Sequence, residues 1–127
     1  MSYRAKVLVL GTLGLLLAAC GKEGSVKPVG FNADIKPILD KKCVACHLPG
    51  GDGFEKTGLR LDGYGHLHTG TKLGPVIAAG SSVSSTLYLT VSGKTHRTIH
   101  MPKQGDPLSD GEVALIKRWI DEGAKNN

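Results

Sequence analysis

Two stretches of the chain carry apolar residues at helical spacing, and the first of them precedes residue 43. Ile35, Ile38 and Leu39 stand at positions i, i+3 and i+4, which places them on one face of a helix. Asp34 comes immediately before them and belongs to the residue types that commonly cap a helix N-terminus. We therefore expect a helix that begins at Asp34 and continues towards Cys43.

The second stretch lies near the C-terminus and carries the clearest helix signals in the sequence. Ser109 and Glu112 have the spacing of a capping box, in which each side chain bonds to the backbone N–H of the other residue. Leu108 and Val113 are placed for a hydrophobic staple, and Gly123 is suited to end the helix. The expected buried side of this helix consists of Val113, Leu115, Ile116, Trp119 and Ile120.

The region between these two helices carries weaker signals. Glycines punctuate residues 54–80, so we expect irregular structure there with one short helical turn. Ser84 or Ser85 is placed to cap a short helix from Thr86 to about Val91. The pattern as a whole predicts a small, mainly α domain with a helix at each end and long irregular loops between them.

The first residues of the chain have the pattern of a secretory signal peptide. Arg4 and Lys6 form a short basic segment, and residues 7–17 form an apolar run of 11 residues. A helix that spans a bilayer needs roughly 20 apolar residues, so this run is too short to be one. We expect residues 1–19 to be removed on export.

A cysteine directly follows the expected signal peptide. Residues 17–20, Leu-Ala-Ala-Cys, resemble the lipobox of bacterial lipoproteins, in which the cysteine receives the lipid and becomes the new N-terminus. The alternative is an ordinary signal peptide with an incidental cysteine. We expect a lipid on Cys20, a flexible tether over residues 20–30 and a folded domain over residues 31–127. The protein would then lie on the periplasmic face of a bacterial membrane, and Gly21-Lys22 favours the outer membrane slightly because the aspartate linked to inner-membrane retention is missing.

Charge and composition narrow the function classes. Loss of the two cations Arg4 and Lys6 lowers the formal net charge from +5 to +3, and the sequence contains no basic stripe of the kind that binds nucleic acid. We expect no nucleic-acid partner. With 18 glycines, two Phe, three Tyr and one Trp, a domain of this size buries little apolar area by itself. A large apolar cofactor in its centre would compensate for that.

Cys43-Val44-Ala45-Cys46-His47 is the C-x-x-C-H signature of covalent haem c attachment. Its spacing lets both thiols reach one edge of the porphyrin while the adjacent imidazole points at the iron. One alternative is a disulfide or redox-active pair, which usually accompanies a βαβ pattern that we do not find. The other is a zinc site in which Cys43 and Cys46 join His96 and His100.

Met101 is the best candidate for the second axial iron ligand. It is the only methionine after the expected signal peptide, and it precedes Pro102 in a polar stretch that is a poor place for core packing. A thioether ligand raises the reduction potential, as suits an electron carrier. His100 and His96 are the rival ligands, and either would give bis-histidine iron.

Three other polar side chains lie in the glycine-rich region. Arg60 is its one arginine and is a candidate partner for a haem propionate. His66 and His68 fit solvated surface histidines better than iron ligands.

From Phe31 to Lys125 the motifs resemble those of monohaem c-type cytochrome domains of class I type, and most closely the planctomycete-type cytochrome c domain. The matching residues are Phe31, 34–39, 43–47, 58–62, Gly80, 85–88, 101–102, 108–109 and 119–124. The resemblance implies end helices packed across each other, one haem with an exposed edge, His47 as the proximal ligand and Met101 as the distal one. The family commonly has Met-Pro-Pro after a lysine, whereas this chain has His100 before Met101 and Lys103 after Pro102, which keeps the ligand question open.

These features predict a one-electron carrier that is not an enzyme and that meets redox proteins as donor and acceptor. With both axial positions filled, iron has no open site for a substrate. One alternative is a haem sensor or peroxidase-like protein with an open sixth position. Another is a haem subunit of a larger oxidoreductase.

Overall fold

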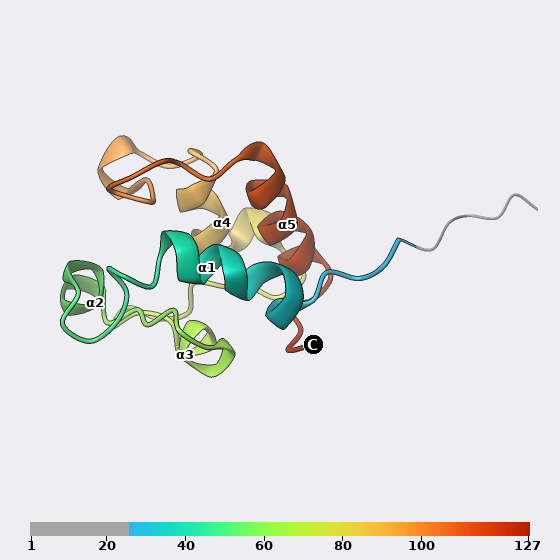
Figure 1. Cartoon of the computed structure of the whole chain (residues 1–127), viewed down its shortest axis with the longest axis horizontal. Coiled ribbons are helices and arrows are strands. Elements are labelled where there is room, and N and C mark those ends of the chain that lie inside the picture. The colour runs from blue at the N-terminus through green and yellow to red at the C-terminus, as the bar shows by residue number, and fades with distance from the viewer. Residues whose placement is uncertain (1–25) are drawn as a thin grey trace, which may run out of the picture.

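The structure, a computed structural model, describes residues 26–127 and is mainly helical in this range (Figure 1). The expected signal peptide and Cys20 lie outside the described residues. A β-bridge between Thr71 and Gly74 is the one β-type pairing in the described range. The elements are the π-helix η1 (Phe31–Ile35), α1 (Lys36–Lys42), α2 (Asp52–Thr57), α3 (Tyr64–Thr69), the 3₁₀ turn η2 (Ser82–Ser84), α4 (Thr86–Val91), the 3₁₀ turn η3 (Arg97–Ile99) and α5 (Asp110–Asp121).

The N-terminal helix begins earlier than the sequence predicts. Gly30 occupies the N-cap position, and η1 runs directly into α1, so the expected start at Asp34 is wrong. Asp34 lies inside the first turn, and its carboxylate accepts a hydrogen bond of 2.7 Å from the backbone N–H of Gly30. The side chain therefore reaches back to a free N–H at the helix start from within the helix, as the glutamate of a capping box does.

The C-terminal helix agrees with its sequence signals. The capping box of Ser109 and Glu112 is formed at the start of α5. At the end of the helix Gly123 has a φ of +100°, and two backbone bonds close a Schellman motif. The N–H of Gly123 donates to the carbonyl of Ile120 at 3.0 Å, and the N–H of Ala124 donates to the carbonyl of Trp119 at 2.8 Å.

The middle of the chain is more helical than expected. In place of one helical turn, residues 54–80 contain the end of α2 and the whole of α3, each of which stops at a glycine with positive φ, Gly58 and Gly70. The short helix α4 agrees with the predicted bounds. Ser85 occupies its N-cap position, but the Ser85 hydroxyl bonds to the backbone of Ala78 and Ser81 and does not cap the helix.

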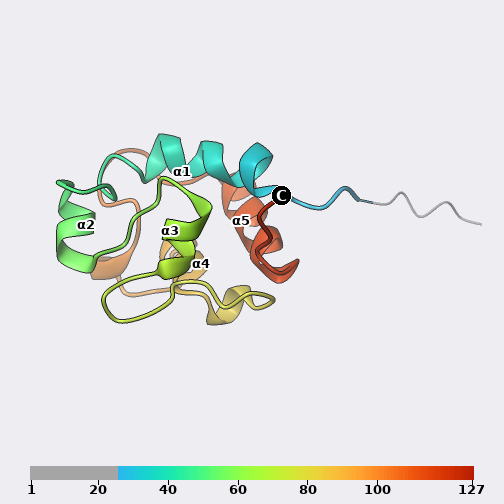
Figure 2. The ribbon, with the colours of Figure 1, turned by 90° about the horizontal axis from the view of Figure 1, so that it is seen from below.

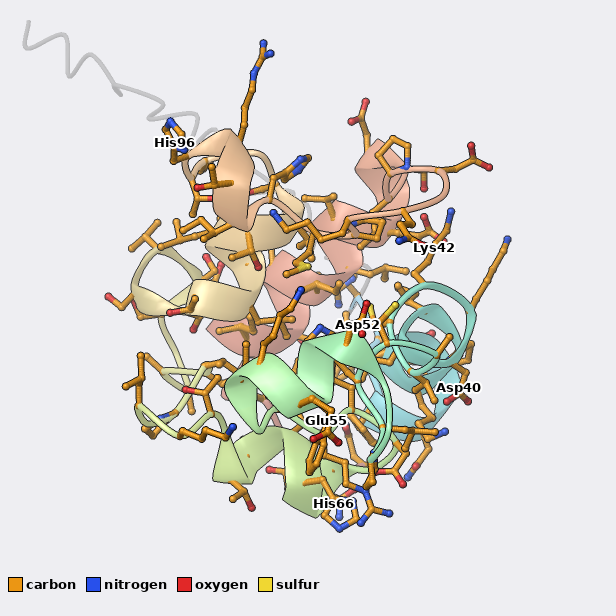
Figure 3. All side chains as sticks on the ribbon, turned by 90° about the vertical axis from the view of Figure 1, so that its left-hand side faces the viewer. Asp40, Lys42, Asp52, Glu55, His66 and His96 are labelled. Carbon is orange, nitrogen blue, oxygen red and sulfur yellow. The ribbon has the colours of Figure 1, made fainter. Side chains whose placement is uncertain are left out.

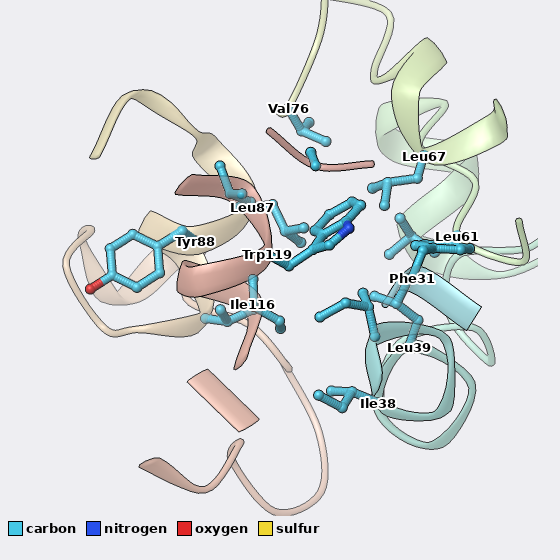
Figure 4. Packing of buried hydrophobic residues seen from close by; sticks show 14 of the residues in the cluster. Phe31, Ile38, Leu39, Leu61, Leu67, Val76, Leu87, Tyr88, Ile116 and Trp119 are labelled. Atoms are coloured by element: carbon cyan, nitrogen blue, oxygen red, sulfur yellow. The ribbon is translucent and has the colours of Figure 1, made fainter. Parts of the chain in front are cut away.

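Trp119 lies in the core among buried side chains of η1, α1, α3 and α4 (Figure 4). Its indole ring is 5.6 Å from the ring of Phe31, measured between centroids, so the first and last helices contact each other there. Tyr64 of α3 packs edge-on against Phe31 at 5.2 Å. Elements far apart in the sequence thus meet on a few aromatic rings, consistent with the low aromatic content.

The chain enters the packed part of the domain slightly before residue 30. Val29 is buried, and its N–H donates a bond of 2.8 Å to the Glu122 carboxylate at the end of α5. The entering segment and the C-terminus lie at one end of the molecule and α2 lies at the other (Figures 1 and 2). Each helix of residues 26–127 is too short or too polar to cross a membrane.

Candidate functional site

The C-x-x-C-H segment forms the turn that joins α1 to α2. After α1 ends, the backbone N–H groups of Cys46 and His47 both donate to the carbonyl of Cys43, at 3.2 and 3.1 Å. This tight turn leaves the Cys43 side chain half-buried against the core and Cys46 exposed, both as free thiols. The His47 side chain, in contrast, is buried. The structure therefore brings the three residues of the signature together in one turn.

The environment of Cys43 bears on the redox-pair alternative. Burial, together with the neighbouring Cys46 and Glu112, raises the pKa of the Cys43 thiol to about 11, and Lys42 opposes the change. Redox-active cysteines work as thiolates and sit where their pKa is lowered. Cys43 is protonated at neutral pH, which is unfavourable for a redox-active Cys43–Cys46 pair.

The imidazole of His47 is held by a backbone carbonyl. Its Nδ1 lies 3.1 Å from the carbonyl oxygen of Leu59, and the His47 carbonyl in turn accepts the N–H of Leu61 at 3.1 Å. Because a carbonyl can only accept, Nδ1 is the donor in this contact, and in the neutral imidazole Nε2 then has the lone pair. This is the arrangement that metal-binding histidines generally have. The sequence did not indicate that Leu59 contacts His47, because a residue of any type can supply a backbone carbonyl.

Two glycines after the signature allow the chain to fold back onto it. A Cβ atom at Gly53 would lie 2.8 Å from both Nε2 and Cε1 of His47, and one at Gly51 would lie 2.6 Å from the carbonyl oxygen of Cys46. Glycine is therefore required at position 51 against the Cys46 carbonyl and at position 53 against the His47 ring. The position of these two glycines shortly after the signature was the available signal.

Met101 lies half-buried against the core on the loop between η3 and α5, so the expectation that this polar stretch is a poor place for core packing is wrong. The backbone N–H of Met101 donates to the carbonyl of Thr90 at 3.0 Å, which attaches this loop to α4. Figure 3 views the molecule from the end that carries α2 and this loop. The thioether is therefore a soft donor in a partly apolar setting.

The rival histidines are placed differently from each other. His96 is exposed and caps η3, where its Nδ1 accepts the N–H of Thr98 at 3.3 Å (Figure 3). His100 is half-buried, with its Nε2 beside Gly93. Residues 26–127 contain no group of three or more His, Cys, Asp or Glu side chains arranged to hold a metal ion. The zinc alternative needs such a group from Cys43, Cys46 and these two histidines, and the structure does not assemble it.

Arg60 already has a partner in the structure. Its guanidinium makes a double contact with the Asp62 carboxylate at 2.8 and 2.6 Å, and this bond lowers the pKa of Asp62 to about 2 with help from His66. His66 is exposed and lies 2.7 Å from the same carboxylate. A propionate contact would require Arg60 to share its guanidinium with Asp62.

His68 does not match the expectation of a solvated surface histidine. It is half-buried, its ring stacks on Tyr64 at 4.2 Å between centroids, and its Nε2 is buried without a hydrogen-bond partner among the described residues. Helical spacing explains the difference, because α3 places residues i and i+4 on one face. In a loop, as we expected, His68 would have been free to point into solvent.

A shallow cavity of about 280 Å³ lies between the segment where the chain enters the domain and the C-terminus. It contains neither cysteine of the signature nor His47 or Met101. Its lining consists of Pro28, Val29, Trp119, Glu122, Lys125 and Asn127.

Comparison with protein-family models, with curated proteins and with solved structures found no match for this chain. The residues alone therefore carry the functional argument. Two free thiols in one turn and an imidazole held through its Nδ1 are the donor types that an iron porphyrin of the c type takes, and Met101 is the one thioether among the described residues. The glycine backbone against Nε2 also fits, since any larger residue at position 53 would fill the space beside that nitrogen.

Proposed function

We propose that this chain is a monohaem c-type cytochrome that carries single electrons between redox proteins. The observation that carries the proposal is the bond between Nδ1 of His47 and the Leu59 carbonyl. It orients the imidazole and leaves Nε2 as a metal donor, in the turn that also presents two free thiols. The mainly α fold with contacting end helices is compatible with a cytochrome c-like domain.

Four side chains would hold the cofactor. Cys43 and Cys46 would form the thioether bonds, His47 would be the proximal iron ligand and Met101 the distal one. Bound in this way, haem c supplies reversible one-electron chemistry. If His47 and Met101 both bound the iron, no position would remain for a substrate, so the proposed function is electron transfer and not catalysis.

The surrounding residues would set the reduction potential and the stability of the two ligands. The Leu59 carbonyl would increase the basicity of the His47 imidazole and so favour oxidised iron. The Met101 thioether would act in the opposite direction and raise the potential. The backbone bond from Met101 to Thr90 attaches the loop to α4 and so restrains the position of the residue that carries the thioether.

The proposed location follows from residues outside the described part of the chain. A signal peptide over residues 1–19 and a lipid on Cys20 would place the protein on the periplasmic face of a bacterial membrane. Two or three acyl chains are enough for stable anchoring. Donors and acceptors would be redox proteins that meet the domain through small, weak interfaces.

A pyridine haemochrome spectrum combined with intact mass of the membrane-extracted protein tests the proposal. We expect the spectrum of haem c and a mass equal to polypeptide, lipid and one haem. The matched control is the double variant Cys43→Ser, Cys46→Ser, which should lose the covalent haem and keep the lipid. A wild-type protein with the mass of polypeptide and lipid alone would refute the proposal.

A further inference from the structure

The hydroxyl of Thr57 connects the two pieces of backbone that hold the His47 ring. Its Oγ1 donates a hydrogen bond of 2.6 Å to the carbonyl of Gly53 and accepts one of 3.1 Å from the N–H of Leu59. Gly53 is the residue whose backbone packs against Nε2, and Leu59 is the residue whose carbonyl accepts the bond from Nδ1. The Thr57 side chain thus links the two backbone segments that contact the two nitrogens of the imidazole.

Thr57 itself is fixed by a neighbouring turn. Its carbonyl accepts the N–H of Lys72 at 2.8 Å, and the ammonium group of Lys72 donates to the carbonyl of Glu55, also at 2.8 Å. A Cβ at Gly58 would lie 3.0 Å from Cγ of Lys72, so the lysine side chain packs closely over the end of α2. These contacts therefore fix the position of the residue that carries the hydroxyl.

A threonine near a helix end often bonds the carbonyl four residues before it, and this bond alone has no functional meaning. Thr69, at the end of α3, provides the comparison. Its Oγ1 also donates to a carbonyl four residues back, that of Gly65 at 3.0 Å. The Thr57 hydroxyl has the additional bond to Leu59, and that bond leads directly to the residue that holds Nδ1 of His47.

We propose that Thr57 is a positioning residue that sets the strength of the bond between His47 and Leu59, and through it the reduction potential of the site. This inference rests on the proposed function. Without the hydroxyl, the N–H of Leu59 loses its acceptor and the Leu59 carbonyl moves from its alignment with Nδ1. A weaker Nδ1 bond makes the imidazole less basic, which disfavours the oxidised iron and raises the potential.

The test is the midpoint potential of the holoprotein with Thr57→Val, which keeps the shape and removes the hydroxyl. We expect the ratio of oxidised to reduced protein at a fixed applied potential to fall several-fold, up to tenfold, and a tenfold change corresponds to about 59 mV for one electron. Thr57→Ser, which keeps the hydroxyl, should have the same potential as the wild type. Thr69→Val is the matched control and should leave the potential unchanged. If valine crowds the site and prevents maturation, Thr57→Ala allows the same comparison.

A second readout follows the bond directly. In NMR spectra of the reduced holoproteins, the Nδ1 proton of His47 should shift upfield in Thr57→Val, and the amide proton of Leu59 should exchange faster. Thr57→Ser and Thr69→Val should resemble the wild type in both. Equal potentials and equal His47 signals in Thr57→Val and Thr69→Val would overturn the inference while leaving the haem in place. Absence of haem from the wild type would instead refute the proposed function.

Discussion

Gly53 lies directly against the imidazole of His47, so that a Cβ atom on Gly53 would stand 2.8 Å from Nε2. Real Cβ atoms essentially never approach another atom this closely, and the His47 side chain is buried, which leaves its ring little room to move. The same backbone segment is fixed to the signature, since the N–H of Phe54 donates to the carbonyl of Cys46 at 3.0 Å. The absence of a side chain at position 53 is therefore a requirement of the site.

The first prediction concerns this close approach. Gly53→Ala should displace the imidazole and reduce the yield of mature haem protein by at least severalfold, measured by haemochrome absorbance per mass of protein. Gly65→Ala in α3 is the matched control, because a Cβ there meets nothing within 4 Å. Alanine is favoured over glycine in a helix by about 1 kcal/mol, so the control should be neutral or slightly more stable. Equal yields from both variants would contradict the proposed placement of His47.

The second prediction concerns the distal ligand. Met101→Ala should abolish the weak far-red absorption band of iron–thioether ligation and lower the reduction potential. His100→Ala and His96→Ala should keep the band, because neither removes the thioether. Loss of a bis-histidine spectrum in His100→Ala, with an unchanged spectrum in Met101→Ala, would assign the ligand to His100 instead.

The third prediction concerns the start of α5. Ser109→Ala removes the hydroxyl that accepts the N–H of Glu112, and it should lower the free energy of unfolding by about 1 kcal/mol in urea titrations. Ser109→Asp keeps an acceptor at the N-cap and should retain most of that stability. If the aspartate variant were as unstable as the alanine variant, the cap would not be the cause.

The fourth prediction concerns acid stability. The Asp121 carboxylate accepts bonds from Lys117 at 2.6 Å and from the N–H of Ser82 at 2.8 Å, and together they lower its pKa from 3.8 to about 2. Because the folded-state pKa is the lower one, the unfolded state binds more protons between these values. The stabilisation is fully present above pH 3.8 and is lost as the pH falls to about 2.

Urea unfolding at a series of pH values checks this prediction. The wild-type free energy of unfolding should fall more steeply between pH 4 and pH 2 than that of Asp121→Asn, which has no carboxylate to protonate at this position. The difference should be small, since the ion pair is partly exposed to solvent. Parallel curves for the two proteins would show that Asp121 does not contribute.

Local sequence signals predicted the elements whose cause is local. The capping box at Ser109 and the stop at Gly123 are found in the structure because each depends on residues within a few positions of one another. The short helix α4 is also found, although the Ser85 hydroxyl does not cap it. The start of the first helix was misplaced at Asp34, since an aspartate can satisfy a free N–H from inside the first turn as well as from the cap.

The helices α2 and α3 were missed for a different reason. Glycine and short length make both segments poor helices in isolation, and tertiary contacts stabilise them. In α2, the backbone packs against His47. In α3, Tyr64 packs against Phe31, and its hydroxyl donates to the carbonyl of Ala124 at 2.8 Å. Contacts of this kind join residues far apart in the chain and leave no periodic pattern.

The sequence by itself determined which donors are available: two thiols and an imidazole at fixed spacing, and one methionine after the expected signal peptide. Only the tertiary structure decided how His47 is held, because its restraints come from the Leu59 carbonyl and the Gly53 backbone. Every residue has a carbonyl, so the sequence cannot mark the one that an imidazole will use. That choice depends on how α2 folds back on the signature, which is a property of the packed chain.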